Sequence, residues 1–174
     1  TVDHFDGKSL PYADNLVNLV VVGRQSSVGR AELLRVLCPG GAAIELDPAA
    51  RNLKPETLVR KPWPEEIDDW THFLHDPDNN AVAQDSLVGP PHQLQWVAGP
   101  RWARSHDHMA SLSAAVSAKG RLFYIVDEAP AATVHVPSQW MLVARDAFNG
   151  VLLWKKEIAP WEDQFRPFRS GPTE

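Results

Sequence analysis

Two short histidine clusters contain the residues of this chain best suited to chemistry. His72 and His75 form the first cluster, and His106 and His108 form the second, each with an aspartate beside or between the histidines. Imidazole and carboxylate groups are common ligands of zinc, copper and iron, and three or four converging groups make a site. On a helix His72 and His75 would share one face, and on a strand His106 and His108 would point the same way. One interpretation is therefore a site for a divalent transition metal built from these four histidines.

A structural role for the same histidines is the competing interpretation, because polar side chains in proline-rich loops usually hydrogen-bond to the backbone. Neither cluster has the His-Glu-x-x-His spacing of a zinc protease. Ser111 and Ser113 follow the second cluster, so the residue types of a Ser-His-Asp triad are present, but no Gly-x-Ser-x-Gly elbow accompanies them. The sequence thus leaves a metal-dependent hydrolase or oxidoreductase that uses a His-rich site as an alternative function, and it firmly implies no cofactor; a divalent transition metal is the one candidate.

The composition limits the classes of function. The chain has 174 residues, 44% of them hydrophobic, and a formal net charge of −5 with scattered cationic residues. A nucleic-acid surface is therefore not expected. No apolar run is long enough to cross a membrane, and the single cysteine excludes an intrachain disulfide framework. The compartment stays open: periplasmic or extracellular if a longer parent protein carries an export signal, and cytoplasmic otherwise.

Residues 1–46 have the pattern of an α/β segment. Residues 16–22 are nearly all apolar, which is typical of a strand buried on both faces of a parallel sheet. Residues 31–37 carry apolar side chains at helical spacing, and a Pro39-Gly40-Gly41 turn should end that helix. A second strand is expected from residue 42. This order predicts a partial Rossmann-like βαβ segment that is too short to be a complete domain.

The rest of the chain changes character twice. Residues 47–92 are interrupted by prolines and are expected to be a connector, in which residues 64–70 have the proline and acidic residues of a short helix start. Residues 93–174 are typical of an all-β region. Alternating or apolar runs predict strands there over residues 94–97, 121–126, 140–144 and 151–158. The expected domains are therefore 1–46, 47–92 and 93–174.

A tight hairpin is the clearest feature of the third region. Asn149-Gly150 can supply the positive φ angles of a short turn between two strands. The stretch from Ala144 to Trp154 reads Ala-x-Asp-x-x-x-Gly and then a tryptophan. It resembles the repeat of quinoprotein (PQQ)-type β-propellers, in which that tryptophan docks between neighbouring blades. The resemblance implies one or two antiparallel propeller-type blades, and a blade cannot bury its own faces alone.

A second resemblance covers residues 3–46. The motifs Phe5-Asp6-Gly7, Leu10-Pro11-Tyr12 and Pro39-Gly40-Gly41, in that order, resemble the second half of class I S-adenosylmethionine-dependent methyltransferases. In that family the acidic residue at the Asp6 position contacts the adenine, so the resemblance implies a cofactor-binding role for Asp6. The glycine-rich loop that the family uses to hold the cofactor is expected to lie upstream of these residues. A scaffold is therefore the favoured interpretation of this segment.

The two resemblances together describe one architecture. The chain is similar to an internal fragment of large bacterial proteins that join a methyltransferase-like segment to a quinoprotein-like propeller. We therefore expect a mixed α/β and all-β chain that acts as a non-catalytic scaffold or binding fragment, while the sequence leaves enzymatic activity undecided. Unpaired sheet edges favour self-association, or pairing with the remainder of a parent propeller.

Overall fold

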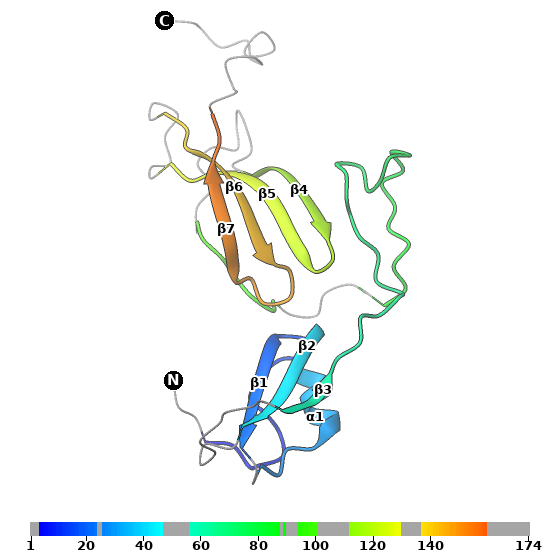
Figure 1. Ribbon diagram of the computed structural model, residues 1–174. Helices are drawn as coiled ribbons and strands as arrows, with labels where there is room; N and C mark the ends of the chain where they lie inside the picture. Colours follow the sequence, from blue (N-terminus) through cyan, green and yellow to red (C-terminus); the bar gives the residue numbers. More distant parts are fainter. Residues whose placement is uncertain are drawn as a thin grey trace, which may run out of the picture. The chain divides into compact units, whose positions relative to one another are not determined.

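Two compact units make up the chain in the computed structural model (Figure 1), which describes residues 4–23, 26–46, 56–87, 89, 94–100, 112–129 and 137–159. The first unit comprises Thr1–Ile67 and Asp85–Trp96, and the second comprises Asp68–Gln84 and Val97–Glu174. The expected connector, residues 47–92, thus contributes residues to both units. Across the described residues no helix is long and apolar enough to cross a membrane.

The first unit is a three-stranded mixed sheet with one short helix. Its elements are β1 (Val17–Gly23), α1 (Arg30–Val36), β2 (Leu37–Leu46) and β3 (Glu56–Arg60). β1 pairs in parallel with β2, β2 pairs in antiparallel fashion with β3, and the sheet order is β1-β2-β3. The strand and helix expected at 16–22 and 31–37 are confirmed with a shift of one residue, but the expectation that the strand is buried on both faces is wrong, because Leu19 and Val21 of β1 are exposed. The α/β character expected for this segment is therefore present.

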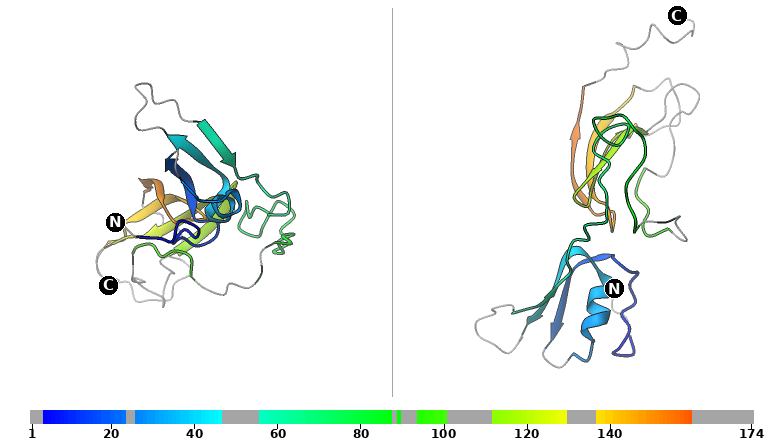
Figure 2. Two further views of the ribbon diagram at one scale, coloured as in Figure 1. Left: turned by 90° about the horizontal axis from the view of Figure 1, so that it is seen from below. Right: turned by 90° about the vertical axis from the view of Figure 1, so that its right-hand side faces the viewer.

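One face of α1 closes the core of this unit. Leu33 on the helix and Leu37, Ala43 and Val59 on the strands are buried together, because α1 lies along one face of the sheet (Figure 2). Burial of large apolar side chains such as these is the main source of stability in a small domain.

Close backbone approach explains the irregular start of β2. Pro39-Gly40-Gly41 was expected to be a turn that ends the helix, but these residues belong to β2. The N–H of Gly40 donates to the carbonyl of Lys61 (3.0 Å) and the N–H of Lys61 to the carbonyl of Gly41 (2.9 Å), so both glycines are paired with the residue after β3. Gly40 adopts a positive φ of 79°, and the β1–β2 register shifts beside it, between Val17 and Leu19.

The second unit is a four-stranded antiparallel sheet. Its strands are β4 (Leu112–Ala118), β5 (Arg121–Asp127), β6 (Trp140–Asp146) and β7 (Leu152–Glu157), and their order in the sheet follows their order in the chain. The strands expected at 121–126, 140–144 and 151–158 are confirmed, and the described residues between 112 and 159 are rich in β-strand.

The expected hairpin between β6 and β7 is also confirmed. The carboxylate of Asp146 accepts the N–H groups of Phe148 (2.9 Å) and Asn149 (3.2 Å), and Gly150 has a φ of 72°. The N–H of Gly150 donates to the carbonyl of Asp146 at 2.9 Å. The aspartate of the Ala-x-Asp-x-x-x-Gly pattern therefore organises the turn, and the glycine supplies the left-handed backbone that the turn requires.

Two expected elements are wrong, and two strands were missed. Residues 94–97 are not a strand, and the side chains of Leu94 and Val97 lie largely in solvent instead of packing in a core. Residues 64–70 are not a helix start: the carboxylate of Asp68 accepts the backbone N–H of Gln84 and that of Asp69 accepts the N–H of Lys119, so neither caps a helix. The missed strands are β3, which lies in the proline-rich connector, and β4, which is rich in alanine and serine.

Candidate functional site

A single carboxylate closes the loop Asp68–Gln84 in the second unit. Oδ2 of Asp68 lies 2.6 Å from Nε2 of His75 and accepts the backbone N–H of Gln84 at 2.7 Å. Hydrogen bonds to a charged acceptor are stronger than neutral ones. We call the three residues Asp68, His75 and Gln84 the clasp. Because it joins the first, middle and last parts of a 17-residue segment, the clasp holds the loop in one shape.

His75 is the buried member of the clasp. Only 4% of the residue is exposed, and its ring meets the ring of Trp70 edge-on with centroids 5.3 Å apart. Its second ring nitrogen, Nδ1, lies 3.5 Å from a carboxylate oxygen of Asp76. Both nitrogens therefore face carboxylates, and the backbone N–H of Gln84 followed by the His75 ring holds the pKa of Asp68 below its ordinary value.

This arrangement gives a pH dependence with a definite sign. Since the pKa of Asp68 is lower in the folded loop than in the unfolded chain, clasp closure is fully stabilised above the unfolded carboxyl pKa of about 4 and is lost as the pH falls through the lowered value. We expect the amide proton of Gln84 to shift upfield in NMR spectra over that acid range. Asp68→Asn should abolish the transition, and an unchanged transition in that variant would contradict the assignment.

A rigid turn next to His75 carries the most exposed aromatic side chain among the described residues. The N–H of His72 donates to the carbonyl of His75 (3.0 Å), and Nε1 of Trp70 donates to the carbonyl of Phe73 (3.3 Å). We call Phe73 and Leu74 the tip of the loop. Phe73 is 74% exposed although the backbone that carries it is held on both sides.

The base of the loop is fixed to the outer edge of β4. The N–H of Ser117 donates to the carbonyl of Trp70 (2.7 Å), and the N–H of Trp70 donates to the hydroxyl of Ser117 (3.1 Å). The N–H of Lys119 donates to the carboxylate of Asp69 (2.9 Å). The loop is therefore anchored by hydrogen bonds on β4, which is the edge of the sheet opposite to β7 (Figure 1).

The predicted metal ligands His72 and His75 lie in this loop. They flank the turn, linked by backbone pairing, and not on one face of a helix. Nδ1 of His72 is 2.8 Å from the hydroxyl of Thr71, whereas His75 faces two carboxylates. In the part of the chain that the structure describes, no group of three or more His, Cys, Asp or Glu residues could hold a metal ion. His106 and His108 lie outside the described residues, so a site that joins the two clusters stays a prediction.

Apolar side chains cover both faces of the β4–β7 sheet. Residues directly opposite one another in antiparallel strands share a face. One face carries the buried cluster Val126, Met141 and Val143, against which Tyr124 packs. The other face, which we call the open face, has two rows of residues that are paired across all four strands. The rows are Val116, Phe123, Ala144 and Trp154, and Ala114, Ile125, Leu142 and Lys156.

The open face is incompletely covered. Trp154 is 45% exposed, and its ring lies 6.1 Å from that of Phe123, so the two aromatic rings extend one apolar surface. Every residue of β7 is exposed, whereas Ala144 beside Trp154 is buried. Antiparallel sheets that face water usually alternate apolar and polar residues. A sheet that is apolar on both faces therefore has the pattern of an inner layer.

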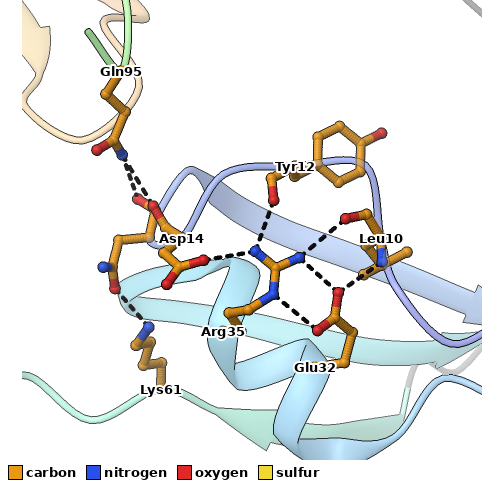
Figure 3. Close-up of polar contacts among 8 residues, drawn as sticks. Leu10, Tyr12, Asp14, Glu32, Arg35, Lys61 and Gln95 are labelled. Carbon is orange, nitrogen blue, oxygen red and sulfur yellow. Dashed lines mark hydrogen bonds and ion pairs between the residues drawn. The ribbon is translucent and has the colours of Figure 1, made fainter. Parts of the chain in front are cut away.

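A separate polar network organises the first unit around Arg35 (Figure 3). Its guanidinium donates to both carboxylate oxygens of Glu32, to the carboxylate of Asp14, and to the carbonyls of Leu10 and Tyr12. These five bonds use all five N–H groups of the arginine. The side-chain hydrogen bond from Arg35 lowers the pKa of Glu32 to about 2. The network therefore has a structural role, and the guanidinium of Arg35 has no N–H group left to bind an anionic ligand.

Two further donors, Lys61 and Gln95, extend the same network. Nζ of Lys61 donates to the side-chain carbonyl of Asn15 at 2.6 Å, and Nε2 of Gln95 donates to the backbone carbonyls of Asp14 and Asn15. Desolvation lowers the pKa of Lys61. These contacts tie the segment before β1 to Gln95 and to Lys61, the residue after β3.

Asp6, the predicted contact to adenine, closes its own turn. One carboxylate oxygen accepts the N–H groups of Ser9 (2.7 Å) and Lys8 (2.8 Å), which lowers the pKa of Asp6. Oδ1 is thus already used, and the neighbouring carbonyls of Leu10 and Tyr12 are taken by Arg35. The role in cofactor binding stays a prediction from the resemblance, and the described residues supply no arrangement from which methyl transfer follows.

No protein-family model, curated protein or solved structure matches this chain. The geometry of the second unit is therefore the main guide to function. Sequence reasoning singled out His72 and His75 but missed Asp68, the residue on which the loop depends. The available signal was the pair of acidic residues directly before Trp70, which a non-helical segment uses as acceptors for distant N–H groups.

Proposed function

We propose that this protein is a non-catalytic scaffold whose β4–β7 sheet packs by its open face against a second sheet of the same kind. The observation that carries the proposal is the half-exposed Trp154 beside Phe123, on a sheet whose other face already holds a buried cluster. Burying a large apolar side chain contributes about 1.5–3 kcal/mol, so a neighbouring sheet would stabilise the unit substantially.

A blade of a quinoprotein-like β-propeller is the specific arrangement that we propose. Propeller blades are four-stranded antiparallel sheets, and each blade is covered on both faces by its neighbours. The four consecutive strands, the turn organised by Asp146 and the position of Trp154 four residues after Gly150 support this proposal. The first unit would then be part of a Rossmann-like layer, supported by the parallel β1–α1–β2 arrangement and by the exposed Leu19 and Val21 of β1.

Self-association tests the proposal. We expect sedimentation velocity to give a weight-average mass that rises with concentration, together with a blue shift of tryptophan emission as Trp154 is covered. Trp154→Ser should lower the association constant by about tenfold or more, the effect of losing one large apolar contact. Trp63→Ser, which removes a similarly exposed tryptophan from the first unit, is the matched control and should leave association unchanged. A wild-type protein that is monomeric at every concentration would overturn the proposal.

A further inference from the structure

Complementary surfaces lie at the two opposite edges of the β4–β7 sheet. The loop Asp68–Gln84 is anchored on β4, where Trp70 is hydrogen-bonded to Ser117. The exposed strand β7 forms the other edge. One copy of the unit therefore presents two different surfaces in opposite directions, an arrangement that suits head-to-tail contact between copies.

The loop surface is apolar at its tip and acidic around it. Residues 68–84 contain four aspartates and no lysine or arginine. Asp78 is exposed and Asp76 is partly exposed, both within five residues of Phe73 in the chain. The backbone that carries Phe73 does not need to be ordered on binding, because the clasp and the turn already hold it. A preorganised anchor binds with a smaller loss of conformational entropy.

The surface of β7 has the opposite charge and the same apolar character. Trp154 and Lys156 lie two residues apart and point to the open face, opposite Ala144 and Leu142 of β6. Both side chains are exposed. Lys155 points to the other face, and its ammonium pairs with Glu128 at 2.6 Å. The open face at the β7 edge is therefore aromatic and basic.

We propose that the tip of the loop Asp68–Gln84 from one copy docks on Trp154 and Lys156 of a second copy. Phe73 packs against the indole of Trp154, and the carboxylates of Asp76 and Asp78 pair with the ammonium of Lys156. The inference rests on the proposed function, since it names what covers the β7 end of the open face. The contact is heterologous, so successive copies form a ring or a filament and not a two-fold dimer.

Two single variants test the two surfaces separately. Phe73→Ser disables the loop surface, and Lys156→Glu disables the β7 surface by placing like charges opposite each other. Each variant alone should associate about tenfold more weakly than wild type or worse. Phe5→Ser and Lys8→Glu make the same chemical changes at exposed positions of the first unit, and they should have no effect.

Mixing the two variants decides the geometry. A copy with Lys156→Glu still has an intact loop, and a copy with Phe73→Ser still has an intact β7, so an equimolar mixture should give a dimer and nothing larger. The charge exchange Asp78→Lys with Lys156→Glu in one chain should restore association. If both single variants associate as wild type does while Trp154→Ser does not, the docking inference is wrong and the scaffold proposal stands. If wild type itself is monomeric, the scaffold proposal fails first.

Discussion

Gly41→Ala should disrupt the first sheet, lowering the free energy of unfolding of the first unit by about 3 kcal/mol, at the upper end of the usual range for overpacking. A Cβ at this position would lie 2.9 Å from the carbonyl oxygen of Cys38 and 3.0 Å from those of Asn18 and Val17. All three atoms belong to the backbone, so no side-chain rotation can relieve the clash. β1 and β2 would have to separate where their register shifts. Urea denaturation, combined with hydrogen exchange of the β1 and β2 amides, measures the effect.

Gly23→Ala is the matched control for this substitution. Gly23 ends β1, no heavy atom lies within 4 Å of an added Cβ, and its φ is not in the left-handed region. Alanine there should change stability by less than about 0.5 kcal/mol, as surface substitutions usually do. Equal stability of the two variants would mean that β1 and β2 are not packed as closely at Gly41 as the structure has them.

Elements that depend on local sequence patterns could be predicted from the sequence, whereas elements that depend on distant backbone pairing could not. β1, α1 and the β6–β7 hairpin follow from local patterns, namely an apolar run, helical spacing and an Asn-Gly turn. The Pro39-Gly40-Gly41 segment also looks local, but its conformation is set by pairing with Lys61, which lies 20 residues or more away along the chain. Such pairing cannot be read from the segment itself. The proline-rich connector hid β3 for the same reason.

Some residues of the candidate site could be predicted from the sequence, and others could not. Asp146 and Trp154 lie at short distances on either side of an Asn-Gly turn in the sequence, so the hairpin and the apolar side chains beside it could be predicted in outline. The clasp could not be predicted from the sequence, because Asp68 and Gln84 lie 16 residues apart and meet only once the loop is anchored on β4. The two histidines attracted attention as metal ligands by residue type. Their surroundings differ sharply, since His75 is buried against carboxylates and Trp70 while His72 is exposed.

His75→Asn should open the loop Asp68–Gln84 while leaving the β4–β7 sheet folded. His75 adopts a φ of 74°, and asparagine is chosen because it tolerates this conformation better than most residues, so backbone strain is not the cause of any effect. Its shorter side chain cannot replace the 2.6 Å contact to Asp68 or the ring contact to Trp70. We expect the amides from Phe73 to Gln84 to exchange at least about tenfold faster, the consequence of losing one hydrogen bond to a charged group. The amides of β5 and β6 should keep their protection.

His72→Asn separates this structural role from metal binding. His72 is exposed, and its Nδ1 lies beside the hydroxyl of the adjacent Thr71 and not against Asp68, so its removal should leave loop exchange unchanged if Asp68, His75 and Gln84 hold the loop. A transition-metal site built on His72, His75, His106 and His108 makes the opposite prediction. It requires that added zinc slow exchange in wild type and that both variants lose this response.

A metal bound at Nε2 of His75 would have to displace the carboxylate of Asp68, which already lies against that nitrogen and closes the loop. Metal binding would then loosen Gln84 instead of protecting it. Protection of Gln84 by zinc in wild type, lost in both variants, would therefore overturn the clasp.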